Sequence, residues 1–387
     1  MSNNKVLLVN FFPFINSSGG AEKVCCNMAN ALQERGWEIK IVCNDDQQGK
    51  AFYPLDEKIE VINLACKNNL KIPRHLKLKR ELQKIFRKTK RLNCCDDYKY
   101  NFWAKKLQAI VQAQNPQLII CFDMEGAHAL DRIESAQVKK IFMLHMNSSG
   151  FKEYLLEDVR HFQVLNRFDV IQVLFPSHKE ELAQIISTEI VVIPNVVPNY
   201  VLEKPLAERE PVIMNLARIC QEKGQDILIE AFALVAHKYP QWQLKLYGKV
   251  TNEKYFKKLQ VLIEKAGLAN QIEFAGVTEK TEAELKKAKI FVFPSLNEGF
   301  PLALTEAMSA GLPCIGFENC AGVKDLLIDG KTGLLVKREA QQLAKALETL
   351  IVDTPLAQEL ALAGKQSLEK YRAVHIWDTW DKLIRGL

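Results

Sequence analysis

The sequence KIFVFPSLNEGFPLALTEAMSAGLPCIG, residues 289–316, contains the signals of a strand, a loop, a helix and a second strand. Its apolar run Ile290–Phe293 predicts a strand that is buried on both faces, as in a parallel sheet. After a polar loop we expect a helix to begin near Pro301, because proline lacks the N–H group that a first helical turn leaves unpaired. Gly311 then predicts the end of this helix, and Cys314–Phe317 predicts the next strand. The stretch is therefore typical of a parallel α/β domain.

Two carboxylates mark this stretch: Glu298 lies in the loop and Glu306 in the predicted helix, with seven residues between them. A helix N-terminus that follows a strand favours anions, because its N–H groups are unpaired and its dipole is positive there. A bound phosphate would repel the carboxylates, so we expect them to accept hydrogen bonds from sugar hydroxyls on either side of the phosphates. An ordinary strand–helix turn with solvated glutamates has the same spacing, so this pair alone does not separate the two interpretations.

Length and composition indicate a soluble globular protein with more than one domain. The chain has 387 residues, of which 48% are hydrophobic and 25% are charged, as in ordinary globular proteins. We find no apolar stretch of the roughly 20 residues that cross a membrane, and no secretory signal before the first predicted strand. The ten cysteines form no Cys-x-x-Cys pair, which argues against a structural zinc site and a disulfide framework. We therefore expect a cytoplasmic protein with reduced thiols.

The positive charge of the chain is concentrated in residues 67–92, called here the basic segment. Eleven Lys and Arg residues lie between Lys67 and Arg91 with one acid, Glu81, whereas the formal net charge of the whole chain is +6. Apolar residues follow a helical spacing within it, at Leu78, Leu82, Ile85 and Phe86. The segment suits an anionic membrane surface or an anionic acceptor, and solvent alone remains an alternative. We expect no nucleic acid as a partner, because interleaved aromatic residues and a reading module are absent.

The first half of the chain begins with a strand, a helix and a strand, as a doubly wound domain does. We predict strands at Lys5–Phe12 and Glu38–Cys43, with a helix from about Ala21 between them, capped by Ser17 or Ser18. Gly19 and Gly20 precede this helix and would let phosphate approach the backbone closely, although two glycines before a helix are also common in simple turns. The glycine spacing of a dinucleotide-binding fingerprint is absent.

A histidine ends a later buried strand of the same half. His145 follows the predicted strand Lys140–Leu144, and ligands of α/β proteins bind at the carboxyl ends of such strands. A single histidine at such a place is also compatible with a purely structural role. The proline-rich break Pro194–Pro198 then predicts a domain boundary, so that we expect an N-terminal domain at 1–195, a second domain at 196–368 and a final helical segment at 369–387.

The second half repeats the same alternation of strands and helices. The predicted strand Pro211–Ala217 leads into Arg218 and Lys223, which lie in one loop. Arginine offers a planar fork of donors and lysine a point charge, so the two suit the oxygens of a diphosphate. The alternative is a pair of solvated loop charges.

These signals resemble, in their order along nearly the whole chain, the retaining nucleotide-sugar glycosyltransferases of family four. The order is the Gly-Gly loop, His145, the proline-rich break, Arg218 with Lys223, and Glu298 with Glu306. The resemblance implies the GT-B architecture, in which two doubly wound Rossmann-like domains face a central cleft. It also implies that the last helix packs back on the N-terminal domain, which is the acceptor side.

The resemblance carries roles for single residues. It implies that His145 contacts the donor sugar, that Arg218 and Lys223 hold the diphosphate, that Glu306 accepts the ribose hydroxyls, and that Glu298 accepts hydroxyls near the anomeric carbon. We therefore expect Glu298, His145, Arg218 and Lys223 to be catalytic. The other expected donor-binding positions are Gly19, Gly20, Gly248, Gly276, Val277, Gly299, Phe300, Pro301 and Leu302. Many relatives have Gly-x-Gly where this chain has Gly-Lys-Val at 248–250, which puts a specific role for Lys249 in doubt.

The activity implied is transfer of a hexose or N-acetylhexosamine, with retention, from a nucleotide-diphosphate sugar such as a UDP-sugar. We expect a surface-polysaccharide or lipid-linked glycan as acceptor, no metal ion and no other cofactor, and a cytoplasmic location that includes the inner face of the membrane. Two alternatives stay open at this point. One is a nucleotide-dependent oxidoreductase or epimerase, and the other is a non-catalytic two-domain protein that binds sugar.

Overall fold

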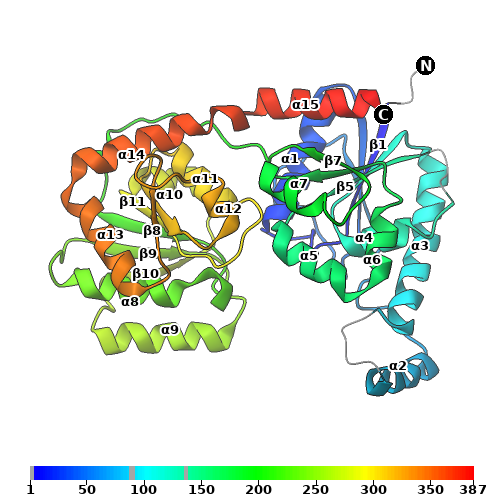
Figure 1. Ribbon diagram of the computed structural model, residues 1–387, viewed down its shortest axis with the longest axis horizontal. Helices are drawn as coiled ribbons and strands as arrows, with labels where there is room; N and C mark the ends of the chain where they lie inside the picture. Colours follow the sequence, from blue (N-terminus) through cyan, green and yellow to red (C-terminus); the bar gives the residue numbers. More distant parts are fainter. Residues whose placement is uncertain (1–3, 87–91, 135–137) are drawn as a thin grey trace. The chain divides into compact units, whose positions relative to one another are not determined.

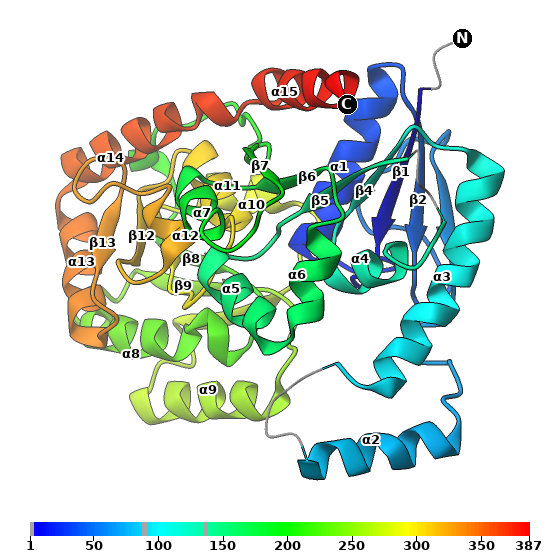
Figure 2. The same cartoon turned by 45° about the vertical axis from the view of Figure 1, so that its right-hand side comes forward.

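The computed structural model describes residues 4–86, 92–134 and 138–387 and divides the chain into two compact units (Figure 1). Unit 1 comprises Met1–Asn195 together with Ile376–Leu387, and unit 2 comprises Val196–His375. Each unit contains a parallel sheet with helices on its faces (Figures 1 and 2). The expected fold class, two α/β Rossmann-like domains, is confirmed.

The sheet of unit 1 has the strand order β3-β2-β1-β4-β5-β6-β7 among the described residues, and its strands pair in parallel. The central strands are buried along nearly their whole length, because helices cover both faces of a parallel sheet. The strands are β1 (Lys5–Asn10), β2 (Glu38–Cys43), β3 (Glu60–Asn63), β4 (Leu118–Cys121), β5 (Lys139–Met143), β6 (Val170–Val173) and β7 (Glu189–Val192).

Aromatic and aliphatic side chains of the helices fill the core of unit 1. Trp103 is 1% exposed, and its ring meets that of Phe11 edge to face at 5.6 Å. The helices are α1 (Gly20–Glu34), α2 (Arg74–Phe86), α3 (Cys94–Gln114), α4 (Met124–Leu130), α5 (Ser148–Glu157), α6 (Val159–Leu165), α7 (Pro176–Leu182) and α15 (Ala373–Gly386).

Helix α15 completes unit 1 although it ends the chain. Trp37 donates a hydrogen bond from its Nε1 atom to Asp381 Oδ1 at 2.8 Å, and the Arg385 guanidinium lies over the Trp37 ring at 5.0 Å. Arg35 forms an ion pair with Asp378 at 3.3 Å. These contacts tie the last helix to the segment between α1 and β2.

The sheet of unit 2 has the order β10-β9-β8-β11-β12-β13, again with parallel pairing. Its strands are β8 (Val212–Leu216), β9 (Gln243–Tyr247), β10 (Ile272–Gly276), β11 (Ile290–Phe293), β12 (Cys314–Phe317) and β13 (Leu334–Val336). Its α-helices are α8 (Gln225–Ala236), α9 (Glu253–Ala266), α10 (Thr281–Lys287), α11 (Leu302–Ser309), α12 (Ala321–Lys324), α13 (Ala340–Val352) and α14 (Thr354–Ser367). Short 3₁₀ turns are η1 (Leu206–Glu208), η2 (Gln221–Lys223) and η3 (Glu369–Tyr371).

Each sheet reverses its strand order once, between β1 and β4 in unit 1 and between β8 and β11 in unit 2. The chain leaves such neighbouring strands toward opposite faces of the sheet, so a crevice opens at their carboxyl ends, where ligands of this fold class bind. The switch point of unit 2 joins the loop after Leu216 to the loop after Phe293.

Two details of the expected helix starts are wrong. Helix α1 has Gly19 at its N-cap, without a side-chain hydrogen bond, so neither Ser17 nor Ser18 caps it. Pro301 is the N-cap of α11 and not a residue of its first turn.

Within the basic segment, α2 is helical as the spacing predicts. Residues 87–91 and the side chains of residues 84–86 lie outside the described part of the chain.

Unit 1 contains four histidines whose pKa is lowered by burial. Burial lowers the pKa of His145 and of His178 to about 4 and that of His128 to about 3, and it also lowers the pKa of His161. Below about pH 6.5 the unfolded chain binds protons at these sites that the folded chain does not bind, so stability falls as the pH decreases toward the folded pKa values. Burial raises the pKa of Asp123 to about 6. The folded chain therefore binds a proton at Asp123 more readily than the unfolded chain, and this one group partly offsets the loss of stability at low pH.

Replacing His178 by leucine is expected to reduce the acid sensitivity of unit 1. Both ring nitrogens of His178 are buried without a hydrogen-bond partner in the described structure. The loss of unfolding free energy between pH 7 and pH 5 should be smaller by about 2 kcal/mol in His178→Leu, measured by urea unfolding at both pH values. His237→Leu, at an exposed position of unit 2, is the control. An equal pH dependence in His178→Leu and the unmodified protein would contradict the expectation.

Candidate functional site

An ion pair joins the two loops at the switch point of unit 2. The Lys223 Nζ atom lies 2.6 Å from Glu298 Oε1, and the two side chains are only 13% and 16% exposed. The backbone also connects the loops, since Leu296 N–H donates to the carbonyl of Glu222 at 2.9 Å. Two of the residues expected to be catalytic are therefore in direct contact.

Ser295 completes this contact and was missed by the sequence analysis. It is 1% exposed, and its hydroxyl donates to Glu298 Oε1 at 2.5 Å while lying 3.5 Å from Lys223 Nζ. The signal available in the sequence was a serine directly after Pro294 and three residues before Glu298. The carboxylate of Glu298 is thus oriented by one cation and one hydroxyl.

Glycines allow the loops around this pair to approach closely. Gly224 has φ +65°, and a Cβ atom there would collide with the carbonyl oxygen of Pro294. A Cβ atom at Gly322 would lie 2.8 Å from the carbonyl oxygens of Glu298 and Gly299. The backbone on either side of the Lys223–Glu298 pair is therefore packed too tightly for any other residue type.

The second expected cation, Arg218, lies in the same loop region but outside the ion pair. It is exposed, and among the described residues its side chain has no hydrogen-bond or ion-pair partner. Its carbonyl oxygen accepts a hydrogen bond from Gln225 Nε2 at 2.9 Å. The guanidinium is therefore free to meet an anion, whereas Lys223 already has Glu298 as its partner.

Gly248 and Gly276 form the backbone surface next to Arg218. Gly248 N–H donates to the carbonyl of Gly276 at 2.7 Å, and a Cβ atom at Gly248 would collide with the carbonyl oxygen of Ala217. Both glycines have positive φ, +144° and +70°. Val277 follows with 51% of its surface exposed, so an apolar side chain is available beside these glycines.

The start of α11 lies directly after Glu298. Gly299, Phe300 and Pro301 are buried, and the Phe300 ring packs edge to face on Tyr371 at 5.7 Å. Leu302, the first helical residue, is half-buried. The first N–H groups of α11 receive no side-chain cap from the N-cap residue, which leaves a helix N-terminus with the polarity that favours an anion.

Glu306 lies further along α11 and is only 5% exposed. Burial and the nearby Glu306 carboxylate both raise the pKa of Tyr200. Glu306 is therefore a more deeply buried carboxylate than Glu298, and a ligand could reach only a small part of it.

In unit 1 two aspartates hold the segment that leads to the Gly-Gly loop. Asp123 accepts hydrogen bonds from Phe11 N–H at 2.6 Å and from Gly126 N–H at 2.8 Å, which ties the end of β1 to the start of α4. Asp45 accepts from Phe14 N–H at 2.7 Å and from Ile15 N–H at 2.8 Å. The sequence analysis missed both roles, although each aspartate closely follows a buried strand.

Gly19 and Gly20 lie at the start of α1, as the sequence predicts. A Cβ atom at Gly19 would collide with the carboxylate of Glu22, which is itself 5% exposed. A buried carboxylate therefore lies against this loop and weakens its attraction for phosphate. Gly20 is exposed, so its backbone is accessible.

His145 lies at the carboxyl end of β5, stacked on Phe122 with ring centroids 5.1 Å apart. Its Nε2 atom is buried and has no hydrogen-bond partner in the described structure. Because burial lowers its pKa to about 4, the imidazole is neutral at pH 7. It suits a neutral hydroxyl better than a phosphate.

The expected site residues thus fall into two groups. Gly19, Gly20 and His145 belong to unit 1, and the remaining positions belong to unit 2. Within unit 2 the structure places Lys223 on Glu298 and brings the backbones of Gly248 and Gly276 together. It places Arg218 outside the ion pair and Glu306 in the interior of a helix.

Both halves of the chain match glycosyltransferase families. Residues 18–199 match the family model described as Glycosyltransferase Family 4, and residues 199–367 match that of the glycosyl transferases group 1. An uncharacterised glycosyltransferase of Haemophilus influenzae is 26% identical over 381 residues, which cover 97% of this chain and 98% of that protein.

A second relative and a solved structure also align over their full length. The GalNAc-alpha-(1->4)-GalNAc-alpha-(1->3)-diNAcBac-PP-undecaprenol alpha-1,4-N-acetyl-D-galactosaminyltransferase of Campylobacter jejuni is 23% identical over 383 residues, covering 98% of each chain. The crystal structure of Anabaena HepE in complex with UDP-glucose has a TM-score of 0.74 at 18% identity and covers 99% of this chain and 100% of that chain. The structural likeness concerns the fold.

Replacing Gly248 by alanine is expected to destabilise unit 2 strongly, because the new Cβ would meet the backbone of the Arg218 loop. Gly267→Ala is the matched control, since Gly267 also has positive φ, +69°, but has nothing within 4 Å of a Cβ position. The control should lower the unfolding free energy by about 1 kcal/mol, and Gly248→Ala by clearly more, in thermal or urea unfolding. Equal losses in the two variants would show that the close approach at Gly248 carries no cost.

Proposed function

We propose that this two-domain glycosyltransferase moves a hexose or N-acetylhexosamine from a nucleotide-diphosphate sugar, a UDP-sugar by preference, to a surface-polysaccharide or lipid-linked glycan. The proposal includes membership of family four and retention of the anomeric configuration. The observation that carries the proposal is the contact of Lys223 with Glu298 at the switch point of unit 2. It puts a phosphate-binding cation and a hydroxyl-accepting carboxylate side by side, as a donor with a diphosphate next to a sugar requires.

The diphosphate is held by positive groups of unit 2. Arg218 offers a free guanidinium, Lys223 an ammonium, and the N-terminus of α11 unpaired N–H groups. These groups stabilise the negative charge that grows on the diphosphate as it leaves the sugar. Lys223 then exchanges Glu298 for a phosphate oxygen, and Glu298 accepts hydrogen bonds from hydroxyls of the donor sugar.

The remaining positions complete the donor site. Glu306 accepts the ribose hydroxyls, and the backbones of Gly248 and Gly276 with the side chain of Val277 lie along the nucleoside. For the positions of unit 1 the proposal keeps the roles that the family resemblance implies. These are a contact of the neutral His145 imidazole with a sugar hydroxyl and a close approach of phosphate to the backbone of Gly19 and Gly20.

Transfer proceeds on one face of the donor sugar. The bond between the anomeric carbon and the diphosphate oxygen breaks, the acceptor hydroxyl oxygen bonds to the anomeric carbon from the same face, and the leaving phosphate takes the acceptor proton. The configuration is therefore retained without a covalent nucleophile of the protein. Because cationic side chains and a helix N-terminus supply the positive charge, the reaction requires no metal ion.

The names of the relatives support the choice of substrates. The Haemophilus relative is named a glycosyltransferase, and the Campylobacter relative is named for a lipid-linked glycan and an N-acetylgalactosaminyl group. The solved structure of similar fold contains UDP-glucose. No observation favours the oxidoreductase, the epimerase or the non-catalytic sugar-binding protein.

The basic segment supports attachment to an anionic membrane surface at the cytoplasmic face. Its helix α2 exposes Leu78 by 68% and Leu82 by 57% amid basic residues. Arg80 pairs with Glu81, the one acid of the segment, at 2.8 Å. Basic residues near an anionic surface contribute roughly 1 kcal/mol each. Of the helices in the described ranges, none has both the length and the apolar character to cross a bilayer.

The donor and the roles of the ion pair are tested together by nucleotide release from UDP- and GDP-sugars, with and without lipid-linked acceptors. We expect turnover of a UDP-sugar that persists in EDTA and gives a product of retained anomeric configuration. Lys223→Ala should weaken UDP binding about 10- to 100-fold, as the loss of a hydrogen bond to a charged group does, measured by calorimetry. Glu298→Gln should leave UDP binding within a few-fold and lower the rate of transfer.

Lys249→Ala is the control, because Lys249 is exposed in the neighbouring loop and contacts Ile219 only through its carbonyl. Loss of activity in Lys223→Ala with donor binding intact would contradict the phosphate role of Lys223. A product of inverted configuration would reject the family assignment, and absence of turnover with all nucleotide sugars would reject the proposed activity.

Membrane attachment is tested by flotation with vesicles of phosphatidylglycerol or of phosphatidylcholine. The protein should float with the anionic vesicles only, and less so at high salt because salt screens the attraction. The double variant Leu78→Ser/Leu82→Ser should lose most of the bound fraction, whereas Val261→Ser, at a position of α9 that is 46% exposed, should not. Equal flotation of the double variant and the unmodified protein would contradict the role of α2.

A further inference from the structure

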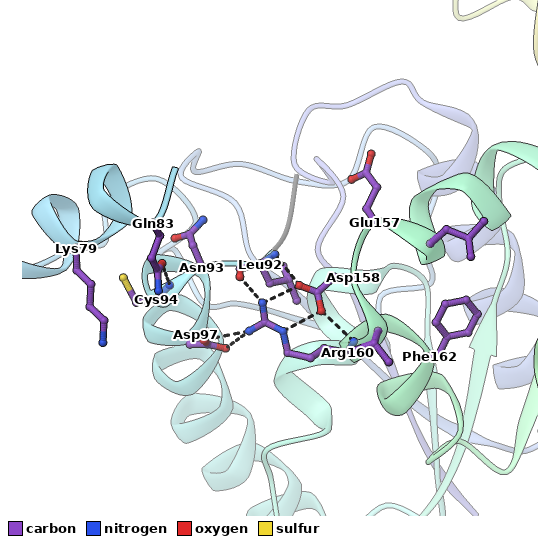
Figure 3. Close-up of a pocket in the computed structure, with 12 residues that line it drawn as sticks. Lys79, Gln83, Leu92, Asn93, Cys94, Asp97, Glu157, Asp158, Arg160 and Phe162 are labelled. Carbon is purple, nitrogen blue, oxygen red and sulfur yellow. Dashed lines mark hydrogen bonds and ion pairs between the residues drawn. The ribbon is translucent and has the colours of Figure 1, made fainter. Parts of the chain in front are cut away.

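A separate hollow lies in unit 1, between α2, the start of α3 and the junction of α5 with α6 (Figure 3). Its volume is about 610 Å³. Lys79 and Gln83 line it from α2, Asp97 from α3, and Glu157 and Val159 from the α5–α6 junction. The donor-site residues of the proposed function do not line it.

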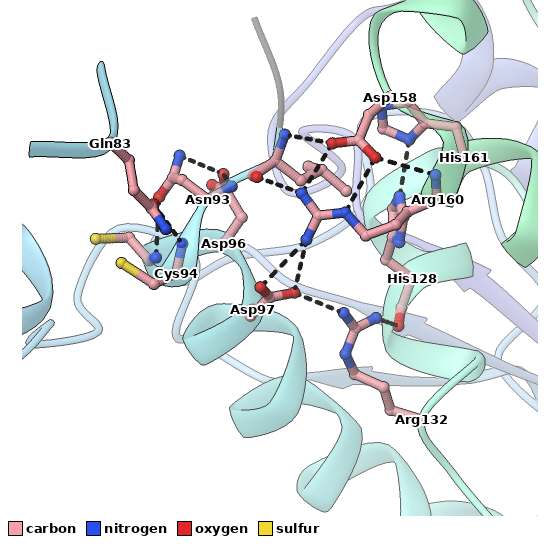
Figure 4. Close-up of polar contacts among 12 residues, drawn as sticks. Gln83, Asn93, Cys94, Asp96, Asp97, His128, Arg132, Asp158, Arg160 and His161 are labelled. Atoms are coloured by element: carbon pink, nitrogen blue, oxygen red, sulfur yellow. Dashed lines mark hydrogen bonds and ion pairs between the residues drawn. The ribbon is translucent and has the colours of Figure 1, made fainter. Parts of the chain in front are cut away.

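The wall of the hollow is fixed by a network around Arg160 (Figure 4). Its guanidinium binds Asp158 at 2.8 and 3.0 Å and Asp97 at 3.2 Å, and it also donates to the carbonyl of Leu92. Asp97 additionally accepts from Arg132 at 3.0 Å. Burial alone would raise the pKa of Asp158, but the hydrogen bonds from Arg160 hold it well below its usual range. The wall therefore keeps its charges and its shape at neutral pH.

The charges of the described lining residues favour an uncharged occupant over an anion. These residues, which do not include 84–91, contain two cations, Lys79 and Arg160, and three acids, Asp97, Glu157 and Asp158. Arg160 is already neutralised by two of the acids. A phosphate would meet carboxylates without a free guanidinium, so the hollow differs in chemistry from the donor site.

The same lining suits a neutral polyhydroxyl compound. Carboxylates accept hydrogen bonds from hydroxyls, and the Gln83 amide and the Lys79 ammonium donate to them. Phe162 and Leu156 supply apolar surface for the C–H faces of a ring. A concave site with apolar patches and a few fixed polar groups is the usual form of a small-molecule site.

Helix α5 sets the distance of the hollow from the reacting sugar. Its first residue, Ser148, comes soon after His145 at the carboxyl end of β5, and its last residue, Glu157, lines the hollow. At 1.5 Å per residue the ten residues of α5 span about 15 Å. A ligand that reaches from His145 to the hollow is therefore longer than the single sugar that receives the new bond.

We infer that the hollow is a distal acceptor subsite, which binds an uncharged sugar residue of an oligosaccharide at some distance from the growing end. This inference rests on the proposed transferase function and specifies its acceptor as an oligosaccharide of several residues. The subsite selects acceptors by length, because short acceptors cannot reach it.

Filling the hollow tests the inference. Val159 lines it and is 66% exposed, so Val159→Trp adds bulk at the rim without disturbing the core. Val352→Trp, at a position of unit 2 that is 65% exposed, is the matched control. Saturation-transfer NMR measures binding of neutral oligosaccharides of one to four hexose or N-acetylhexosamine residues to the full chain without donor. Binding of the longer members should be lost in Val159→Trp and kept in Val352→Trp.

Steady-state kinetics provides the second readout. In Val159→Trp the KM for acceptors of three or more sugars should rise at least tenfold, with the KM for one-sugar acceptors unchanged. Equal effects on long and short acceptors, or no binding of any oligosaccharide in the panel, would overturn the subsite. UDP release from the donor without acceptor reports the transferase function alone, so a failure of the subsite is distinguishable from a failure of the proposed function.

Discussion

Parallel pairing of the strands is the constraint on which the rest of the structure depends. When all strands of a sheet run in one direction, their carboxyl ends meet at one edge, and the loops that leave neighbouring strands in opposite directions open a crevice there. In unit 2 this constraint brings Lys223 onto Glu298 across a sequence separation of 75 residues. In unit 1 it places Asp123 against the end of β1 across 112 residues. The polar residues of both units are therefore positioned by strand direction before any side chain selects a partner.

In the proposed function, the Lys223–Glu298 pair links the recognition of phosphate to that of sugar. Both charges are largely buried, and removal of either partner from a buried pair leaves an unpaired charge that costs about 3–5 kcal/mol. A diphosphate that takes Lys223 away from Glu298 therefore needs a substitute partner for the carboxylate. The hydroxyls of the donor sugar are suitable substitutes, together with the hydroxyl of Ser295 that is already in place. A nucleotide without its sugar satisfies only half of this exchange.

The sequence predicts those parts of the protein that depend on local signals. Buried strands such as Ile290–Phe293 were predicted because four consecutive apolar residues are sufficient evidence. The edge strand Glu60–Asn63 was not, because it is short and only half-buried. The sequence places Lys223 and Glu298 in the same site but does not predict that they are in contact. The role of Ser295 was missed because a single serine forms no recognisable sequence pattern. The subsite around Arg160 could not be predicted, since its walls come from segments far apart in the sequence.

Because α15 packs on unit 1, that unit consists of two segments that are far apart in the sequence. Residues 196–375 lie between two segments of one unit. Trp37, which is 2% exposed, contacts Asp381 and Arg385 of the final segment. During synthesis unit 2 is therefore completed before unit 1, although unit 1 begins first. To exchange unit 2 between two such proteins, residues 196–375 must be replaced with one junction at each end. A fusion at a single junction would leave unit 1 without α15.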